Sequence, residues 1–169
     1  MSGVTPTVVS PRRARGTSGE STTLTGAHMP ETDDVIDKIE HDHREVEHLF
    51  EEFEASRDRA IALKICEELE IHTAAEEMAV YPVIAAEAGE EAEIEDAEEE
   101  HDEARDLIAR IRQSDGDDEL AELVGQLKTA IAHQVHEEET DILPKARHEM
   151  AESELQELGE AFDEAKESQ

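Results

Sequence analysis

Residues 69–82, Leu-Glu-Ile-His-Thr-Ala-Ala-Glu-Glu-Met-Ala-Val-Tyr-Pro, decide the fold of this chain. Apolar residues recur through and around this stretch at helical spacing, which predicts an amphipathic helix with one face toward a core. His72 and Glu76 fall on that apolar face one turn apart, so the imidazole and the carboxylate should project together into the interior. Because a carboxylate is rarely buried without a partner, we expect a cation held by both side chains.

The composition limits the classes of partner. The chain has 169 residues, enough for one domain with a real core, and 15 Lys and Arg against 47 Asp and Glu give a net charge of -32. This acidity argues against nucleic acid and anionic membrane surfaces as partners, since both are polyanions. The single cysteine, Cys66, fits a reducing, cytoplasmic setting. No apolar run approaches the roughly 18 residues of a membrane span.

The N-terminal segment differs from the rest of the chain. Residues 1–30 are rich in Ser, Thr, Gly and Pro and lack apolar periodicity, so we expect them to be disordered. The pair Arg12-Arg13 does not indicate twin-arginine export, because a polar segment follows it. We expect a helical domain over residues 31–150 and a short C-terminal helix and tail over residues 151–169.

Four long segments carry helical patterns with short connections between them. They span about residues 33–56, 58–81, 91–113 and 118–143, and a shorter pattern follows at about 152–166. Long amphipathic helices joined by short loops are typical of bundles in which neighbours run antiparallel. The sequence therefore predicts an all-α, up-down-up-down four-helix bundle with a short C-terminal helix.

Polar residues interrupt the inward faces of these helices at matching depth. His43, His72 and His101 take this place on the first three helices, and Glu76 and Glu138 on the second and fourth. One such histidine would be an ordinary core residue, but three with two carboxylates favour a metal site. Without a metal, the two carboxylates would face each other as like charges, and the pKa of both should rise.

The residues around these positions resemble the hemerythrin-like, or HHE cation-binding, domain family. The resemblance covers about residues 33–147 and rests on His43 in His-Asp-His-Arg-Glu, His72-Thr-Ala-Ala-Glu76, His101 in Glu-Glu-His-Asp-Glu, and His133-Gln-Val-His-Glu-Glu-Glu-Thr-Asp-Ile-Leu-Pro144. It implies a non-haem di-iron centre with terminal imidazoles and two bridging carboxylates. It also implies that His43, His72 and Glu76 serve one iron and His101 the other. Imidazole and carboxylate ligands suit iron, and zinc or manganese fits the same set.

The third helix departs from the family pattern at one position. Oxygen-carrying hemerythrins have a second histidine one turn before the ligand on this helix, and here that position is Ala97. One iron should therefore be more open than in those carriers.

The fourth helix is ambiguous. Glu76 lies six residues before Pro82 and Glu138 six before Pro144, so the counterpart of His72 is Gln134. His133 is five residues from Glu138 and would need a one-residue π-bulge to share its face. We expect that bulge, and the expected ligands are then His43, His72, Glu76, His101, His133 and Glu138. The alternatives are His133 with Glu137 at regular spacing, His136, or no imidazole from this helix.

These features predict a di-iron-binding protein that interacts with dioxygen or peroxide in sensing, handling or detoxification. A more open iron favours peroxide chemistry, although the pattern does not decide whether the chain is an enzyme. The alternative function is a non-catalytic iron-binding, storage or regulatory bundle. A ferritin-type Glu-x-x-His pattern also occurs, but its glutamates (Glu40, Glu45 and Glu98) lie off the inward faces or at their edges.

Overall fold

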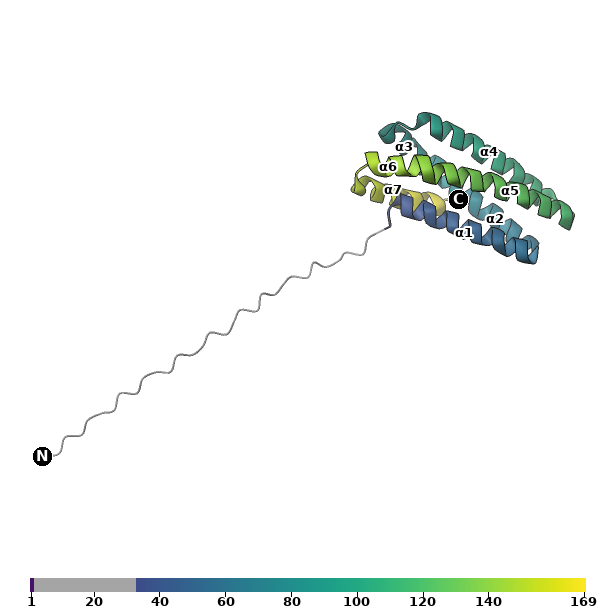
Figure 1. Ribbon diagram of the computed structural model, residues 1–169, viewed down its shortest axis with the longest axis horizontal. Helices are drawn as coiled ribbons and strands as arrows, with labels where there is room; N and C mark the ends of the chain where they lie inside the picture. The colour runs from purple at the N-terminus through teal and green to yellow at the C-terminus, as the bar shows by residue number, and fades with distance from the viewer. Residues whose placement is uncertain (2–32) are drawn as a thin grey trace. The chain divides into compact units, whose positions relative to one another are not determined.

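The computed structural model describes Met1 and residues 33–169, and the regular elements within this part of the chain are helices (Figure 1). Residues 33–169 lie within one compact unit. The predicted all-α class is confirmed. Apart from Met1, the segment for which disorder is expected, residues 1–30, lies outside the described residues.

Four long helices form the bundle. They are α1 (Val35–Ser56), α2 (Arg59–Ala75), α4 (Glu91–Gln113) and α5 (Asp117–Glu137). The pairs α1 and α2, and α4 and α5, pack against each other along their lengths (Figure 1). Only Arg57 and Asp58 connect α1 to α2, and Arg57 takes the left-handed conformation (φ 56°) that reverses the chain there. Such short connections make sequential helices antiparallel neighbours, as predicted.

Two of the long helices continue through a wide turn. After α2 come the π-helical turn η1 (Glu76–Val80) and α3 (Tyr81–Ala88), and after α5 come η2 (Glu138–Ile142) and α6 (Leu143–Glu149). Pro82 and Pro144 each follow a wide turn closely. A proline cannot donate a backbone hydrogen bond, and its ring clashes with the carbonyl four residues earlier, so a wider turn accommodates it. Each wide turn begins at a glutamate, Glu76 or Glu138.

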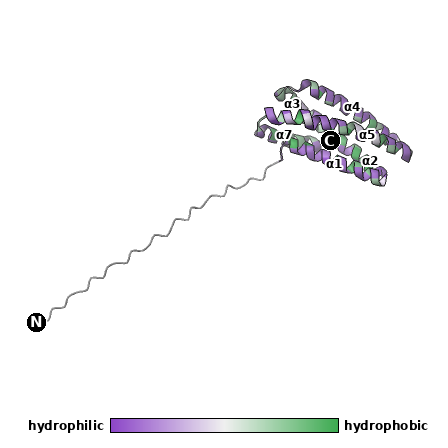
Figure 2. Cartoon of the chain, in the orientation of Figure 1, coloured by the Kyte–Doolittle hydropathy of each residue, from purple (hydrophilic) through white to green (hydrophobic). Residues whose placement is uncertain are grey.

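The apolar core consists of two clusters rather than one. Along α1, Val35, Ile36 and Ile39 belong to the first cluster, whereas Val46 and the residues after it belong to the second. Figure 2 shows hydrophilic and hydrophobic residues interspersed along each helix, as amphipathic helices require. The buried histidines lie at the boundary between the clusters, where His43 interrupts the apolar face of α1.

The last helix, α7 (Glu152–Glu167), packs against α1, α2 and η1. Gly159 permits a close approach to α1, because a Cβ at this position would lie 3.0 Å from the backbone nitrogen of Val35. Lys38 of α1 donates a hydrogen bond to the carbonyl of Gly159 and pairs with Asp163. Phe162 is fully buried and reaches the boundary between the apolar clusters.

None of the helices within the described residues combines the length and the apolar character that crossing a bilayer requires.

Candidate metal centre

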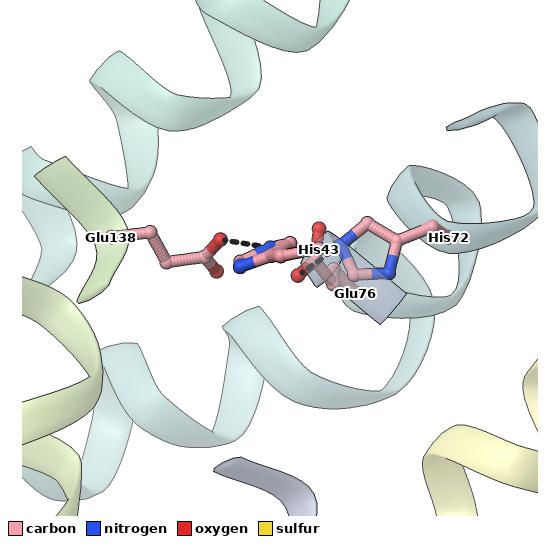
Figure 3. A group of neighbouring side chains, drawn as sticks. All are labelled: His43, His72, Glu76 and Glu138. Carbon is pink, nitrogen blue, oxygen red and sulfur yellow. Dashed lines mark ion pairs between the residues drawn. The ribbon is translucent and has the colours of Figure 1, made fainter. Parts of the chain in front are cut away.

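Two histidines and two glutamates from separate elements converge at the boundary between the apolar clusters (Figure 3). His43 comes from α1, His72 from α2, Glu76 from η1 and Glu138 from η2, and one ligand atom of each lies within 4.8 Å of all the others. His72 Nε2 is 3.0 Å from Glu76 Oε1, and His43 Nε2 is 3.3 Å from Glu138 Oε2. All four side chains are buried.

His101 of α4 extends this group on its other side. Its Nε2 lies 3.5 Å from Glu76 Oε2 and 2.8 Å from the Gln134 side-chain nitrogen. The Tyr81 hydroxyl donates a hydrogen bond to Glu138 Oε1 at 3.2 Å and also lies 3.5 Å from Glu76 Oε2. The two carboxylates therefore lie between the imidazoles of His43 and His72 on one side and His101 on the other.

The donor atoms at the centre of this group lack hydrogen-bond partners. His43 Nε2, His72 Nε2, Glu76 Oε1 and Glu138 Oε2 are fully buried and unpartnered. They face one another only as the ion pairs His72–Glu76 and His43–Glu138, and a buried polar atom without a hydrogen bond costs about 1–3 kcal/mol. A cation bound by these atoms would satisfy all of them, so the residues fit a metal ion.

Each imidazole is oriented from behind by a carboxylate. His43 Nδ1 lies 2.9 Å from Glu139, His72 Nδ1 3.1 Å from Asp42, and His101 Nδ1 2.9 Å from Glu77. An Nδ1–H that donates to a carboxylate leaves Nε2 free for a metal, an arrangement common in histidine metal sites.

A cation holds each of these outer carboxylates. They pair as Glu139 with Arg44, Asp42 with Lys166, and Glu77 with Arg105. The same chain of imidazole, carboxylate and cation thus recurs three times around the centre.

The charges of the central groups depend on one another. Burial opposes the charge of His72, but Glu76 and Asp42 outweigh this effect and raise the pKa of His72 to about 10. Burial likewise opposes ionisation of Glu76, yet His72 and the other imidazoles lower its pKa to about 2. For Glu138, burial and the charge of Glu76 raise the pKa above its usual range. The expectation that both glutamates have raised pKa values is therefore wrong for Glu76, because three imidazoles surround it.

Tyr81 stays protonated at this site. Burial, followed by the charges of Glu138 and Glu76, raises the pKa of its hydroxyl well above the usual value. Its ring is stacked on that of His101, with 5.6 Å between the centroids. The side chain is thus a fixed hydrogen-bond donor beside the two carboxylates.

The prediction for His133 is wrong in this structure. Its side chain is 63% exposed on α5 and lies 3.6 Å from Glu100 and from Glu137, whereas Gln134 is buried and points inward. The helix is regular up to Glu137, and the wide turn follows Glu138 instead of preceding it. Regular spacing therefore places Gln134, four residues before Glu138, on the inward face. His43, His72, Glu76, His101 and Glu138 are brought together as the pattern suggested.

The sequence pattern did not reveal the outer carboxylates or the role of α7. Glu77 and Glu139 each follow a central glutamate directly, so the doubled pairs Glu76-Glu77 and Glu138-Glu139 were an available signal. By contrast, no local pattern indicated that the rings of Phe162 and His72 would form a T-shaped pair, with 5.8 Å between the centroids.

Comparison with known proteins adds one match. Searches of curated proteins and of solved structures gave no match. Residues 34–146 match the family described as the hemerythrin HHE cation-binding domain. This range includes the three inward histidines and both central glutamates, and it ends before α7. The chain is therefore a member of the hemerythrin HHE cation-binding domain family.

Proposed function

We propose that this chain binds a non-haem di-iron centre and that this centre interacts with dioxygen or hydrogen peroxide. The observation that carries the proposal is the convergence of three buried imidazoles and two buried carboxylates from four long helical segments, with the central donor atoms unpartnered. Imidazole and carboxylate together suit iron, and zinc or manganese would accept the same donors.

The arrangement of the donors supports two metal positions. His43 and His72 would serve one position and His101 the other, with Glu76 and Glu138 between them. Glu76 supports this division, because one of its oxygens faces His72 and the other faces His101. A single ion could not use the imidazoles on both sides and still leave both carboxylates neutralised.

The two sides of the centre differ in access. The His101 side adjoins a cavity of about 380 Å³ whose lining includes Ala97, Gln134 and Glu138. Ala97 leaves this side without a second imidazole, so a small molecule has room to approach there. Bound iron would supply redox chemistry toward dioxygen or peroxide, and disproportionation of peroxide to water and dioxygen needs no further reductant. Tyr81 would hold a proton at its hydroxyl beside Glu138.

The setting of this function is part of the proposal. The described part of the chain has one cysteine, Cys66, which is free and buried, and burial raises the pKa of its thiol to about 11. A protonated thiol is a poor nucleophile, so Cys66 would not take part in the redox chemistry. A reducing compartment such as the cytoplasm suits this cysteine usage.

Metal analysis of the purified chain, together with its absorption spectrum, tests the proposal. Protein produced with iron should contain roughly two irons per chain, as in carboxylate-bridged di-iron bundles, and should show oxo-bridge absorption. Adding hydrogen peroxide to it should then release dioxygen. Saturation at one metal ion would refute the bridged centre, and a loaded protein inert to both dioxygen and peroxide would favour iron storage or regulation instead.

A further inference from the structure

The cavity on the His101 side is strongly acidic. It lies where α4 approaches α5 and η2, and seven of its eleven lining residues are Asp or Glu. Its single basic residue, Lys145, pairs with Glu90. Clefts lined by one sign of charge concentrate ions of the opposite sign, so divalent cations should gather here.

The cavity leads from the protein surface to the buried centre. Glu93, Glu100 and Glu137 line its outer part, whereas Ala97, Gln134 and Glu138 are buried at its inner end. Glu138 is 1% exposed, and its Oε2 has no hydrogen-bond partner. An ion that crossed the cavity would therefore reach a buried carboxylate of the proposed centre.

Three side chains with potential metal-ligating atoms lie together beside the outer part of this cavity. Glu100 from α4 and His133 and Glu137 from α5 each offer an atom within 4.8 Å of the other two. His133 Nε2 lies 3.6 Å from Glu100 Oε1 and 3.6 Å from Glu137 Oε1, too far for direct hydrogen bonds. Two of these residues, Glu100 and Glu137, also line the cavity.

We propose that Glu100, His133 and Glu137 form a second cation site, which captures a divalent first-row metal ion and passes it through the acidic cavity to the buried centre. One imidazole and two carboxylates suit Fe²⁺ or Mn²⁺, and the exposed side would keep water on the ion. Three protein ligands with water completing the shell give exchangeable binding, which suits an entry site. The capture step stands by itself, whereas the delivery step rests on the proposed metal centre.

Residue-resolved metal binding tests the capture step. The full chain, ¹⁵N-labelled, is first treated with Zn²⁺ to fill the buried donors and desalted. Paramagnetic Mn²⁺ is then added below stoichiometry, at about 0.15 M ionic strength, where the Debye length is about 8 Å. The amide signals of Glu100, His133 and Glu137 should broaden first.

The surface pair His41 and Glu45 is a matched internal control. It is an exposed pair one helical turn apart, with His41 Nε2 3.7 Å from Glu45 Oε1. It does not belong to a group of three ligating side chains among the described residues. Equal broadening at His41 and His133 would show that Mn²⁺ binds the acidic surface without preference, and it would overturn the proposal. In His133→Ala the preferential broadening should disappear.

Loading rates test the delivery step. Metal-free wild type, His133→Ala, Glu100→Gln and His41→Ala are mixed with Co²⁺, and its absorption is followed to the end point. The first two variants should load several-fold more slowly than wild type and reach the same final metal content, whereas His41→Ala should match wild type. Equal loading rates in all four proteins would exclude delivery through the second cation site. If wild type takes up no metal at its buried centre, the proposed function fails. The Mn²⁺ measurement then still tests the second cation site.

Discussion

At the scale of single residues, the site is defined by which atom of each histidine faces inward. His43, His72 and His101 present Nε2 to the carboxylates and use Nδ1 to contact an outer carboxylate. This division fixes both the ring orientation and the nitrogen available to a metal. Within the described residues the other histidines lie on the surface, including His41, His48 and His148, whose side chains are 71%, 77% and 84% exposed.

Alanine substitutions should separate these two groups of histidines. His43→Ala, His72→Ala and His101→Ala each remove a donor that a metal would use, and each should lower the iron content of the purified protein by half or more. His41→Ala, His48→Ala and His148→Ala should leave it unchanged. Elemental analysis with far-ultraviolet circular dichroism measures metal loss in protein that is still folded. Equal iron loss in His41→Ala and His43→Ala would contradict the assignment.

Gln134 occupies the place where an imidazole was expected. Its amide donates to His101 Nε2, which is consistent with His101 carrying its proton on Nδ1 beside Glu77. Gln134 thus occupies the lone pair that a metal would take, so the amide must move away when His101 binds a metal.

Replacing this amide by an imidazole should strengthen metal retention. In Gln134→His the new side chain supplies a fourth imidazole on the open side of the centre, and loss of iron to a chelator should slow about tenfold, equivalent to 1.4 kcal/mol. Peroxide consumption should fall, because the added ligand fills the accessible position. Gln134→Leu is the control, because it keeps a side chain of similar volume without a donor atom. If a chelator removed iron as fast from Gln134→His as from Gln134→Leu, the new imidazole would not be a ligand.

At the scale of elements, the sequence predicted the helices and most of the centre, because both depend on local periodicity. Histidines placed on apolar faces at helical spacing identified His43, His72 and His101 directly. His133 was expected to face the centre because the π-bulge was placed before Glu138. The wide turn instead begins at Glu138 and accommodates Pro144, which follows it. The contribution of α7 could not be foreseen, since it depends on how a separate helix packs against α1 and α2.

That packing makes α7 part of the support of the centre although it lies outside the matched family range. Lys166 pairs with Asp42, which orients His72, and Phe162 contacts the His72 ring. The helix therefore acts on the centre through a charge and through an aromatic contact.

Removing the charge of Lys166 should weaken metal binding without loss of the fold. In Lys166→Met the apolar stem remains, but Asp42 loses its cation and holds His72 less firmly, so affinity should fall about 10-fold, the low end for such outer contacts. Lys166→Arg should restore it. The matched control is Lys38→Met, which breaks the pair with Asp163 at the same helix interface without touching the centre. Metal titration of the three variants measures the effect, and an equal loss in Lys38→Met would show that helix docking alone matters.

At the scale of the whole molecule, a charged layer divides the apolar core in two. In the metal-free chain this layer holds an imidazolium–carboxylate network, because His72 has its pKa raised to about 10 and Glu76 has its pKa lowered to about 2. Metal and protons therefore compete for the same buried atoms, and metal uptake at neutral pH should release protons.

This competition gives the metal-free chain a specific dependence of stability on pH. A group whose folded pKa is raised binds more protons in the folded state, so the contribution of His72 is fully present below its unfolded pKa of about 6.5 and is lost as pH rises toward 10. The raised pKa of Glu138 acts in the same direction. The lowered pKa of Glu76 acts at the other end of the range, where its contribution is lost as pH falls from about 4.5 toward 2.

Thermal unfolding of metal-free protein between pH 7 and pH 10 should therefore show a falling melting temperature. A loss on the order of 2 kcal/mol corresponds to about 4–8 °C in a chain of this size. His72→Gln removes the titrating imidazole, so its melting temperature should change less over the same range. The metal-loaded chain should also change little, because a bound metal ion replaces the proton on Nε2. Parallel curves for metal-free wild type and His72→Gln would show that the general acidity of the chain, and not the buried network, sets the pH dependence.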